Sequence, residues 1–279
     1  MWCVGTGNNL GRWLGSAWED RGAQVLSLAF DTQGSIWCVG KKNNVGQWDG
    51  SGWDRRGQLA DWELHKAARD GNTHRVPLII GTNRDEGRLF TRGASFLPTD
   101  DQDQSEVAFP EGEQVFLGVD AEYRAALVQA YSEGHRGGDP VHMLGDSVFW
   151  GPAIAFAEGH SAAGNPTYVY RYDFDTKVLR ASGMRATHAT ELFAVFGAYR
   201  TAIGAALAVG DWKTTGKMTR VMQGHWTTFA RTGQPELQWT PYAAANRDTM
   251  VFDVHSRIVH DPYPQRREAW MRAHGLVPA

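Results

Sequence analysis

A repeat within the first 57 residues constrains the fold of this chain more than any other feature of its sequence. The tetrapeptide Trp-Cys-Val-Gly occupies residues 2–5 and again residues 37–40, an offset of 35 residues. The same offset relates Asn-Asn pairs, Gly-Ser pairs and several tryptophans, ending with Trp18 and Trp53. Self-similarity at a fixed period indicates a repeat architecture, in which each unit needs a neighbour to bury its apolar face.

Each repeat unit is predicted to be a β-meander. Residues 25–30 and 35–39 alternate between core-facing and outward-facing types, and the polar residues 31–34 between them are typical of a turn. Asn43 and Asn44 mark a second turn. Short strands joined by such turns are the form of a propeller blade.

The repeat resembles tectonin-type β-propellers, whose blades carry Trp-x-Val-Gly, Gly-x-Trp and Gly-Ser-x-Trp elements. The resemblance implies lectin-like binding of sugars or bacterial surface glycans, and the tryptophans have the alternative role of blade core. A closed propeller needs roughly 4–8 blades. This chain has two copies of the repeat, and the first copy starts within a blade at Trp2. We therefore expect a homo-oligomer that completes the ring, or a truncated chain. The candidate glycan contacts are Asn43, Asn44, Trp48 and Trp53.

A second region has the pattern of a buried strand that ends in a polar loop. Residues 76–82 are a short apolar run rich in branched side chains, and residues 83–87 are polar. A carboxylate here, Glu86, is costly to bury unless it is paired. His188 is a suitable partner, because it lies in a polar stretch just before an apolar segment. In a nucleophile–histidine–acid unit, the acid orients the imidazole, which takes the proton of the nucleophile.

The chain from about residue 65 to its C-terminus resembles the C-terminal part of the type-B carboxylesterases, the group that includes para-nitrobenzyl esterases and cholinesterases. The resemblance implies an α/β-hydrolase fold and hydrolysis of a carboxylic ester, in the chain order nucleophile, acid, histidine. It also implies that Glu86 is the triad acid and His188 the general base. The matching segments, in the order of the family, are residues 76–87, 167–173, 188–197, 226–235 and 239–242.

No serine of this sequence lies in the Gly-x-Ser-x-Gly elbow that holds the nucleophile of the family. Gly145 stands two positions before Ser147, as the motif requires, but Phe149 stands two positions after it, where the motif needs glycine. Ser182 has Arg180 two positions before it, where the motif also needs glycine. These two serines are the candidates within the chain. The alternatives are a nucleophile from a missing segment, a catalytically inactive remnant joined to a glycan-binding repeat, and an unnatural fusion. A Glu–His pair alone activates nothing, since losing even one oxyanion-hole donor costs about 10²–10³ in rate.

Charge and composition exclude several partners. A formal net charge of −3 gives no electrostatic reason to expect nucleic acid or an anionic membrane as a partner. No apolar run approaches the roughly 18 residues of a membrane span, and the first residues lack the pattern of a signal peptide, so localisation stays open. His188 and Glu191 have the spacing of half a metal site, but no second pair joins them. We expect neither a metal nor a cofactor, and a small-molecule ester as substrate.

The sequence thus predicts the α/β class, with an incomplete α/β-hydrolase-like region after an all-β repeat segment. Residues 1–57 form the repeats, 58–75 a junction and 76–279 the carboxylesterase-like region. Only the late strands of a doubly wound sheet are present, so we expect an open apolar face. In the last region we expect helices at 120–131, 146–163 and 217–232, a strand at 167–174, and a hairpin at 250–259.

Overall fold

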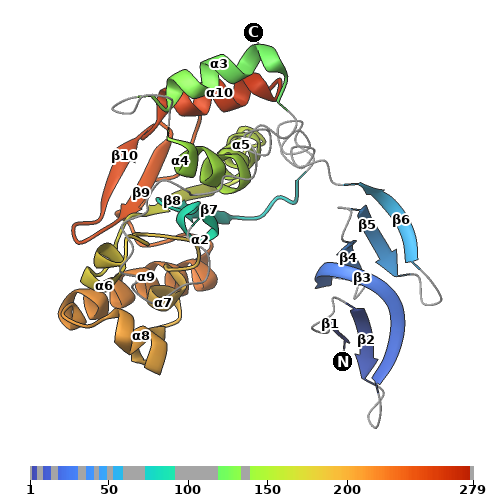
Figure 1. Ribbon diagram of the computed structural model, residues 1–279, viewed down its shortest axis with the longest axis horizontal. Helices are drawn as coiled ribbons and strands as arrows, with labels where there is room; N and C mark the ends of the chain where they lie inside the picture. The colour runs from blue at the N-terminus through green and yellow to red at the C-terminus, as the bar shows by residue number, and fades with distance from the viewer. Residues whose placement is uncertain are drawn as a thin grey trace. The chain divides into compact units, whose positions relative to one another are not determined.

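The chain forms two compact units, Met1–Leu64 and His65–Ala279, drawn in Figure 1. The computed structural model describes the backbone of residues 2–4, 9–13, 18–30, 36–40, 44–48, 53–58, 73–91, 119–132 and 139–276. Side chains are described for residues 73–89, 119–132 and 139–276.

The first unit is an antiparallel β-meander whose strands follow one another in sequence order (Figure 1). The register repeats with the sequence, because Trp13 pairs with Trp18 across one hairpin and Trp48 pairs with Trp53 across the equivalent one. This confirms the predicted meander, and no closed propeller is evident among the described strands. The strands are β1 (Trp2–Val4), β2 (Asn9–Trp13), β3 (Trp18–Phe30), β4 (Ile36–Gly40), β5 (Asn44–Trp48) and β6 (Trp53–Gln58).

The second unit is built on a four-stranded mixed sheet with the order β10-β9-β8-β7. The strands β7, β8 and β9 are parallel, and β10 is antiparallel to β9, which confirms the mixed α/β class and the C-terminal hairpin. Parallel strands that are covered on both faces have nearly continuous apolar sequences, as the Leu-Ile-Ile start of β7 does. The strands are β7 (Leu78–Asn83), β8 (Thr167–Tyr172), β9 (Asp248–Phe252) and β10 (Arg257–His260).

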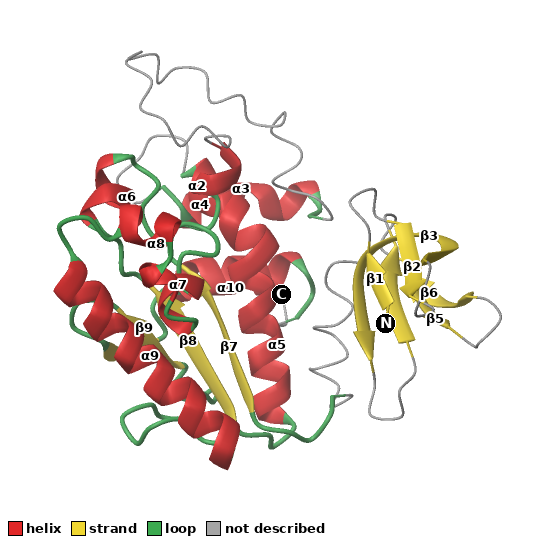
Figure 2. Ribbon diagram, turned by 90° about the horizontal axis from the view of Figure 1, so that it is seen from below, coloured by secondary structure: helices red, strands yellow, loops and turns green. Residues whose placement is uncertain are grey.

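Helices lie on both faces of this sheet. Figure 2 shows α5 (Gly151–Ala162) on one side and α9 (Trp212–Thr232) on the other, with the strands between them. On the α9 side, the rings of Tyr170 and Trp226 meet edge to face with centroids 5.3 Å apart. Aromatic pairs of this geometry add stability beyond the area that they bury. The aromatic layer between β8 and α9 is therefore the main core of the unit.

The predicted helices are confirmed, with shifted ends. α3 (Ala121–Ala130) agrees with its expectation, and a π-helical turn (Asp146–Trp150) precedes α5. α9 begins at Trp212 rather than Lys217, since its first turn contains threonines and a glycine that weaken the sequence signal. The helices that the sequence did not predict are α2 (Arg88–Thr91), α4 (Pro140–Gly145), α6 (Lys177–Ala181), α7 (Leu192–Val195), α8 (Ala202–Leu207) and α10 (Pro264–Ala273).

Within the described residues, β7 is an edge strand of the sheet. A groove of about 530 Å³ lies beside it, lined by the apolar residues of β7 and by Tyr170, Trp226 and Phe229. Parallel strands of this composition normally have both faces covered. The groove agrees with the expectation that the late strands of a larger sheet leave an apolar face open.

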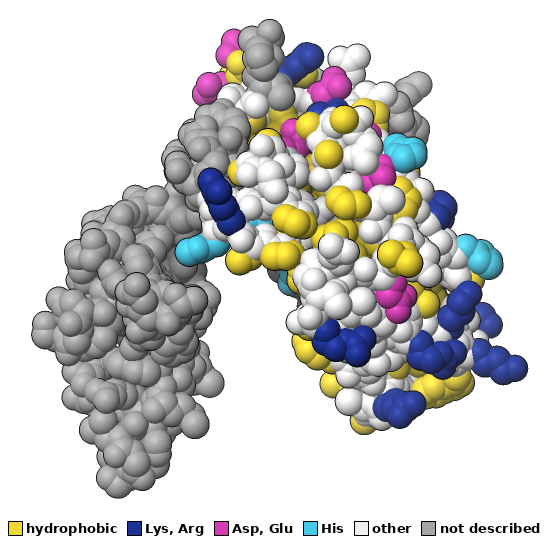
Figure 3. All heavy atoms as spheres, turned by 180° about the vertical axis from the view of Figure 1, so that it is seen from behind, with side chains coloured by type: hydrophobic (Ala, Val, Ile, Leu, Met, Phe, Trp, Pro, Cys, Tyr) yellow, Lys and Arg dark blue, Asp and Glu magenta, His cyan; other side chains and the backbone are white. Residues whose placement is uncertain are grey.

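Basic side chains gather at the end of the second unit that carries α8 and the start of α9 (Figure 3). Lys213, Lys217 and Arg220 follow one another along α9, all exposed, and form no ion pair with the described residues. The small net charge of the chain therefore conceals a local excess of positive charge.

A buried hydrogen-bond network joins α3, the π-helical turn and α10. The hydroxyl of Tyr131 donates to Asp146 Oδ2 at 2.6 Å and accepts from the indole N–H of Trp270 at 2.7 Å. Arg266 lies 3.5 Å from Asp146 and stacks over the Tyr131 ring. Burial raises the pKa of Asp146, so its carboxylate depends on these partners. One hydroxyl thus satisfies two buried polar groups.

We expect Tyr131→Phe to lower the free energy of unfolding by about 1–3 kcal/mol, because Asp146 and Trp270 both lose a buried partner. Urea unfolding followed by circular dichroism measures the change. The control is Tyr123→Phe, a half-buried tyrosine on the same helix, where a change within about 0.5 kcal/mol is expected. Equal losses in the two variants would contradict the role given to the network.

Candidate active site

Glu86 lies in the turn immediately after β7, where the structure brings it to His188. One carboxylate oxygen, Oε1, accepts a hydrogen bond from the backbone N–H of Asn83 at 2.7 Å. The other, Oε2, lies 2.7 Å from His188 Nδ1. The two residues are 102 positions apart in the sequence. The fold therefore joins the two residues that the sequence predicted as acid and base.

His188 lies in the loop that leads into α7. The next residue, Ala189, has a positive φ of 66°, so the backbone turns sharply at this point. The imidazole is 38% exposed, and the ring of Phe149 lies against it with centroids 4.7 Å apart. In a catalytic triad the Nδ1–H of histidine donates to the acid. The contact with Glu86 is made by that nitrogen.

A second carboxylate, Glu191, influences the electrostatics of Glu86. Burial raises the pKa of Glu86 and the negative charge of Glu191 adds to the rise, while hydrogen bonds from Asn83 and His188 oppose it. The side-chain amide of Asn83 donates to Glu191, so Asn83 contacts both carboxylates. The sequence did not predict a role for Asn83, and it indicated Glu191 only as half of a metal site. The one sequence signal for Asn83 is its position at the start of the polar stretch 83–87, directly after the apolar run 76–82.

Asp85, the neighbour of Glu86, is the centre of a buried ion-pair cluster. Its oxygens lie 2.9 Å from Arg84 Nε, 3.0 Å from Arg88 Nε and 3.3 Å from His142 Nε2. Burial alone would raise the pKa of Asp85, but the hydrogen bond from His142 and the arginine charges hold it well below its usual range. The ion pairs of Asp85 therefore hold in place the turn that presents Glu86.

The two candidate serines are engaged elsewhere. The hydroxyl of Ser147 donates to the carbonyl of Leu144 at 2.9 Å, and that of Ser182 donates to the carbonyl of Leu179 at 3.1 Å. Such bonds to the preceding turn are usual for serine in a helix. The structure brings Glu86 and His188 together, but it directs these two hydroxyls to the backbone of their own helices.

The remaining candidates belong to the repeat unit. Asn43 lies outside the described residues, while Asn44, Trp48 and Trp53 are placed by their backbone in β5 and β6. In the described part of the chain, no three or more His, Cys, Asp or Glu residues are grouped as metal ligands. None of the helices described combines the length and the apolar character of a bilayer crossing.

Two glycines allow the turn that carries Glu86 to lie directly on α4. A Cβ atom on Gly87 would lie 2.1 Å from the carbonyl oxygen of Val141, and one on Gly145 would lie 2.8 Å from the Gly87 nitrogen. The latter atom would also lie 3.2 Å from Glu86 Cβ. Both approaches involve backbone, so neither position has room for a side chain.

We expect Gly145→Ala to lower the free energy of unfolding by about 1–3 kcal/mol, because the methyl group displaces the turn. Gly216→Ala in α9 is the control, since its Cβ would meet only the Arg220 side chain, at 3.8 Å. The control should stabilise the chain by up to about 1 kcal/mol through helix propensity. Urea unfolding of both variants measures the difference, and two changes of the same sign would contradict the close contact.

The chain is similar to known carboxylesterases over most of its second unit. The family model described as the Carboxylesterase family matches residues 59–270. The para-nitrobenzyl esterase of Bacillus subtilis is 32% identical over 210 residues, which cover 74% of this chain and 40% of the relative. Carboxylesterase 1F of Mus musculus is 27% identical over 182 residues, covering 61% and 31%.

Solved structures agree with the sequence relatives. A PNB esterase superposes with a TM-score of 0.55 at 26% identity, covering 74% of this chain and 40% of the other. A carboxylesterase of Geobacillus stearothermophilus at pH 6.2 gives 0.57 at 26% identity, covering 78% and 46%. This chain thus spans less than half the length of these relatives. The family match and the shared fold show that the chain belongs to the carboxylesterase family.

Proposed function

We propose that this chain takes part in the hydrolysis of carboxylic esters, with Glu86 as the acid that orients His188 and His188 as the general base. The observation that carries the proposal is the 2.7 Å contact between Glu86 Oε2 and His188 Nδ1. Membership of the carboxylesterase family supports it, because the paired residues follow one another in the chain order acid, then histidine.

The proposed chemistry is acyl transfer. His188 takes the proton of a nucleophilic hydroxyl, whose oxygen attacks the ester carbonyl, and then gives that proton to the departing alcohol. Glu86 holds the ring orientation and stabilises the imidazolium formed in between. Water, activated by the same histidine, releases the acid product in the second half of the reaction.

The nucleophile has two proposed sources. Ser147 and Ser182 would each have to give up a hydrogen bond to a backbone carbonyl in order to reach His188. That arrangement favours a serine in a segment that accompanies the described residues, presented on its own elbow. The chain covers 40% of the length of its Bacillus subtilis relative, so the relative has ample further sequence for such a segment.

We expect His188→Ala to reduce hydrolysis of a short-chain p-nitrophenyl ester by at least about 10³-fold, because the base is lost. Glu86→Gln should cost a comparable factor, since it leaves the imidazolium without its counter-charge. His260→Ala is the matched control, because His260 also contacts a carboxylate, that of Asp248. It should leave turnover unchanged.

A fluorophosphonate label, mapped by mass spectrometry in the same preparations, identifies the nucleophile. Labelling that is lost in Ser147→Ala or Ser182→Ala would place the nucleophile in this chain. Turnover that survives in His188→Ala would sink the proposal. If the protein shows no turnover and takes up no label, the carboxylesterase-like region is a catalytically inactive remnant.

We propose glycan binding as a second function, resting on the resemblance of the repeats to tectonin-type propellers. The supporting observation is that Trp48 and Trp53 are paired in register across the β5–β6 hairpin, as Trp13 and Trp18 are across β2–β3. A repeated aromatic pair at the same hairpin position suits the stacking of sugar rings as well as the core of a blade.

We expect Trp48→Ala and Trp53→Ala to abolish binding on a glycan array and to immobilised lipopolysaccharide, because each removes a stacking surface. The control is Trp212→Ala, a tryptophan of the second unit that is 55% exposed. Unchanged binding in the two repeat variants, or an equal loss in the control, would contradict the assignment.

A further inference from the structure

His142 bridges two carboxylates that come from different segments of the chain. Its Nδ1 lies 2.6 Å from Asp139 Oδ2, and its Nε2 lies 3.3 Å from Asp85 Oδ1. Asp139 also caps α4 by accepting from the backbone N–H of His142 at 3.2 Å. A carboxylate can only accept, so both ring nitrogens must carry hydrogen. The bridge is therefore complete when His142 is an imidazolium, the form in which both ring nitrogens donate.

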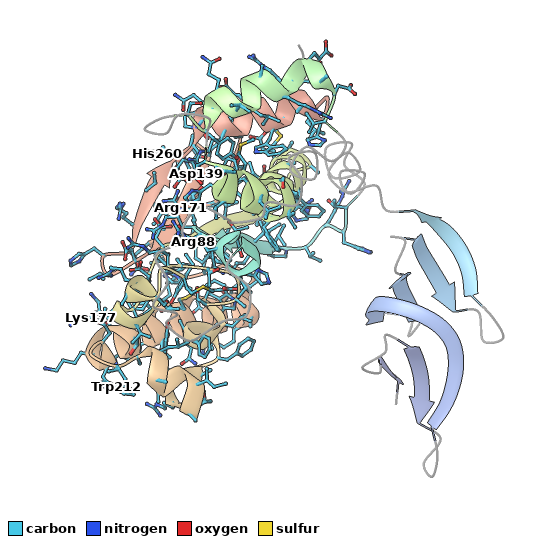
Figure 4. All side chains as sticks on the ribbon, viewed as in Figure 1. Arg88, Asp139, Arg171, Lys177, Trp212 and His260 are labelled. Atoms are coloured by element: carbon cyan, nitrogen blue, oxygen red, sulfur yellow. The ribbon has the colours of Figure 1, made fainter. Side chains whose placement is uncertain are left out.

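The segment that His142 holds is connected to both members of the acid–base pair. Asp85 precedes Glu86, and its backbone N–H donates at 2.9 Å to the carbonyl of Ala186, two residues before His188. Arg88, which pairs with Asp85, donates to another backbone carbonyl of the same segment at 3.3 Å. Figure 4 shows Arg88 and Asp139 in the middle of the unit.

We propose that the charged His142 is a positioning residue for the Glu86–His188 pair, holding the turn that carries Glu86 against α4. This inference rests on the proposed function, in which the pair works as acid and base. Among the described residues, the side-chain hydrogen bonds and ion pairs of His142 go to Asp139 and Asp85 and not to the pair itself. It acts through Asp85, and the glycine contacts between this turn and α4 allow the two segments to lie close enough for the bridge.

The groups around His142 set the pH at which the bridge fails. Burial disfavours its charge, but Asp139, Asp85 and Asp146 raise the pKa of His142 to about 9. Because this value lies above that of an unfolded histidine, about 6.5, the bridge is complete at low and neutral pH. It is lost as the pH rises through about 9. The cations that share these carboxylates are Arg84, Arg88 and Arg266.

The test uses the full chain with isotope-labelled histidine and needs no ester turnover. The NMR resonance of His188 Nδ1, read through the non-exchanging ring C–H protons, reports its hydrogen bond to Glu86. We expect an alkaline transition of this resonance with a midpoint near pH 9, the pKa of His142. His188→Ala assigns the signal, and the control His260→Gln should leave the midpoint unchanged.

The decisive variant is Asp139→Asn, because asparagine caps a helix as well as aspartate but removes one of the negative charges facing His142. We expect the midpoint to move down by about one pH unit or more. His142→Gln should abolish the alkaline transition while circular dichroism shows a folded chain. A midpoint that stays in place in Asp139→Asn, or a transition that persists in His142→Gln, would overturn the inference. These NMR measurements do not depend on the ester assay. The proposed function can therefore fail while the positioning role holds, and the positioning role can fail while the proposed function holds.

Discussion

Buried carboxylates at the ends of β7 and β8 dictate how the segments around them are arranged. Asp85 and Glu86 after β7, and Asp173 and Asp175 after β8, are all less than a tenth exposed. A carboxylate removed from water is costly unless cations or hydrogen-bond donors compensate for the lost hydration. Arg84 from the turn after β7, Arg171 from β8 and Arg180 from α6 therefore converge on the C-terminal ends of these strands. Arg84 alone lies within 4.0 Å of the carboxylates of Asp85, Asp173 and Asp175.

Most of this cluster is paired with arginines, whereas the side-chain partner of Glu86 is the imidazole of His188. That difference separates its chemistry from that of its neighbours. Asp85 keeps its charge at any ordinary pH, because its pKa is held low by His142 and the arginines. Glu86 has a raised pKa and one imidazole partner. The C-terminal ends of β7 and β8 thus combine carboxylates held by arginines with one carboxylate, Glu86, held by a catalytic-type histidine contact.

The sequence predicted those features that depend on local pattern. The apolar run of β7, the alternation of β8, the terminal hairpin and the residues Glu86 and His188 all lie in contiguous motifs. The His142 bridge could not be predicted in this way, because Asp85 and His142 are far apart in the sequence and the surroundings of His142 match no motif. α10 was missed for a related reason. Its first residues are Pro-Gln-Arg-Arg-Glu, and the buried Trp270 and Met271 form too short an apolar signal.

The outer edge of β7 has a consequence for how such a chain behaves outside its folded state. Within the described residues, its backbone groups on that side meet no strand, and the side chains beside them are apolar. An uncovered edge of this kind is a template for the addition of further strands, including those of misfolded copies. During synthesis, pairing of the β7 edge within the protein would therefore compete with aggregation through the same edge.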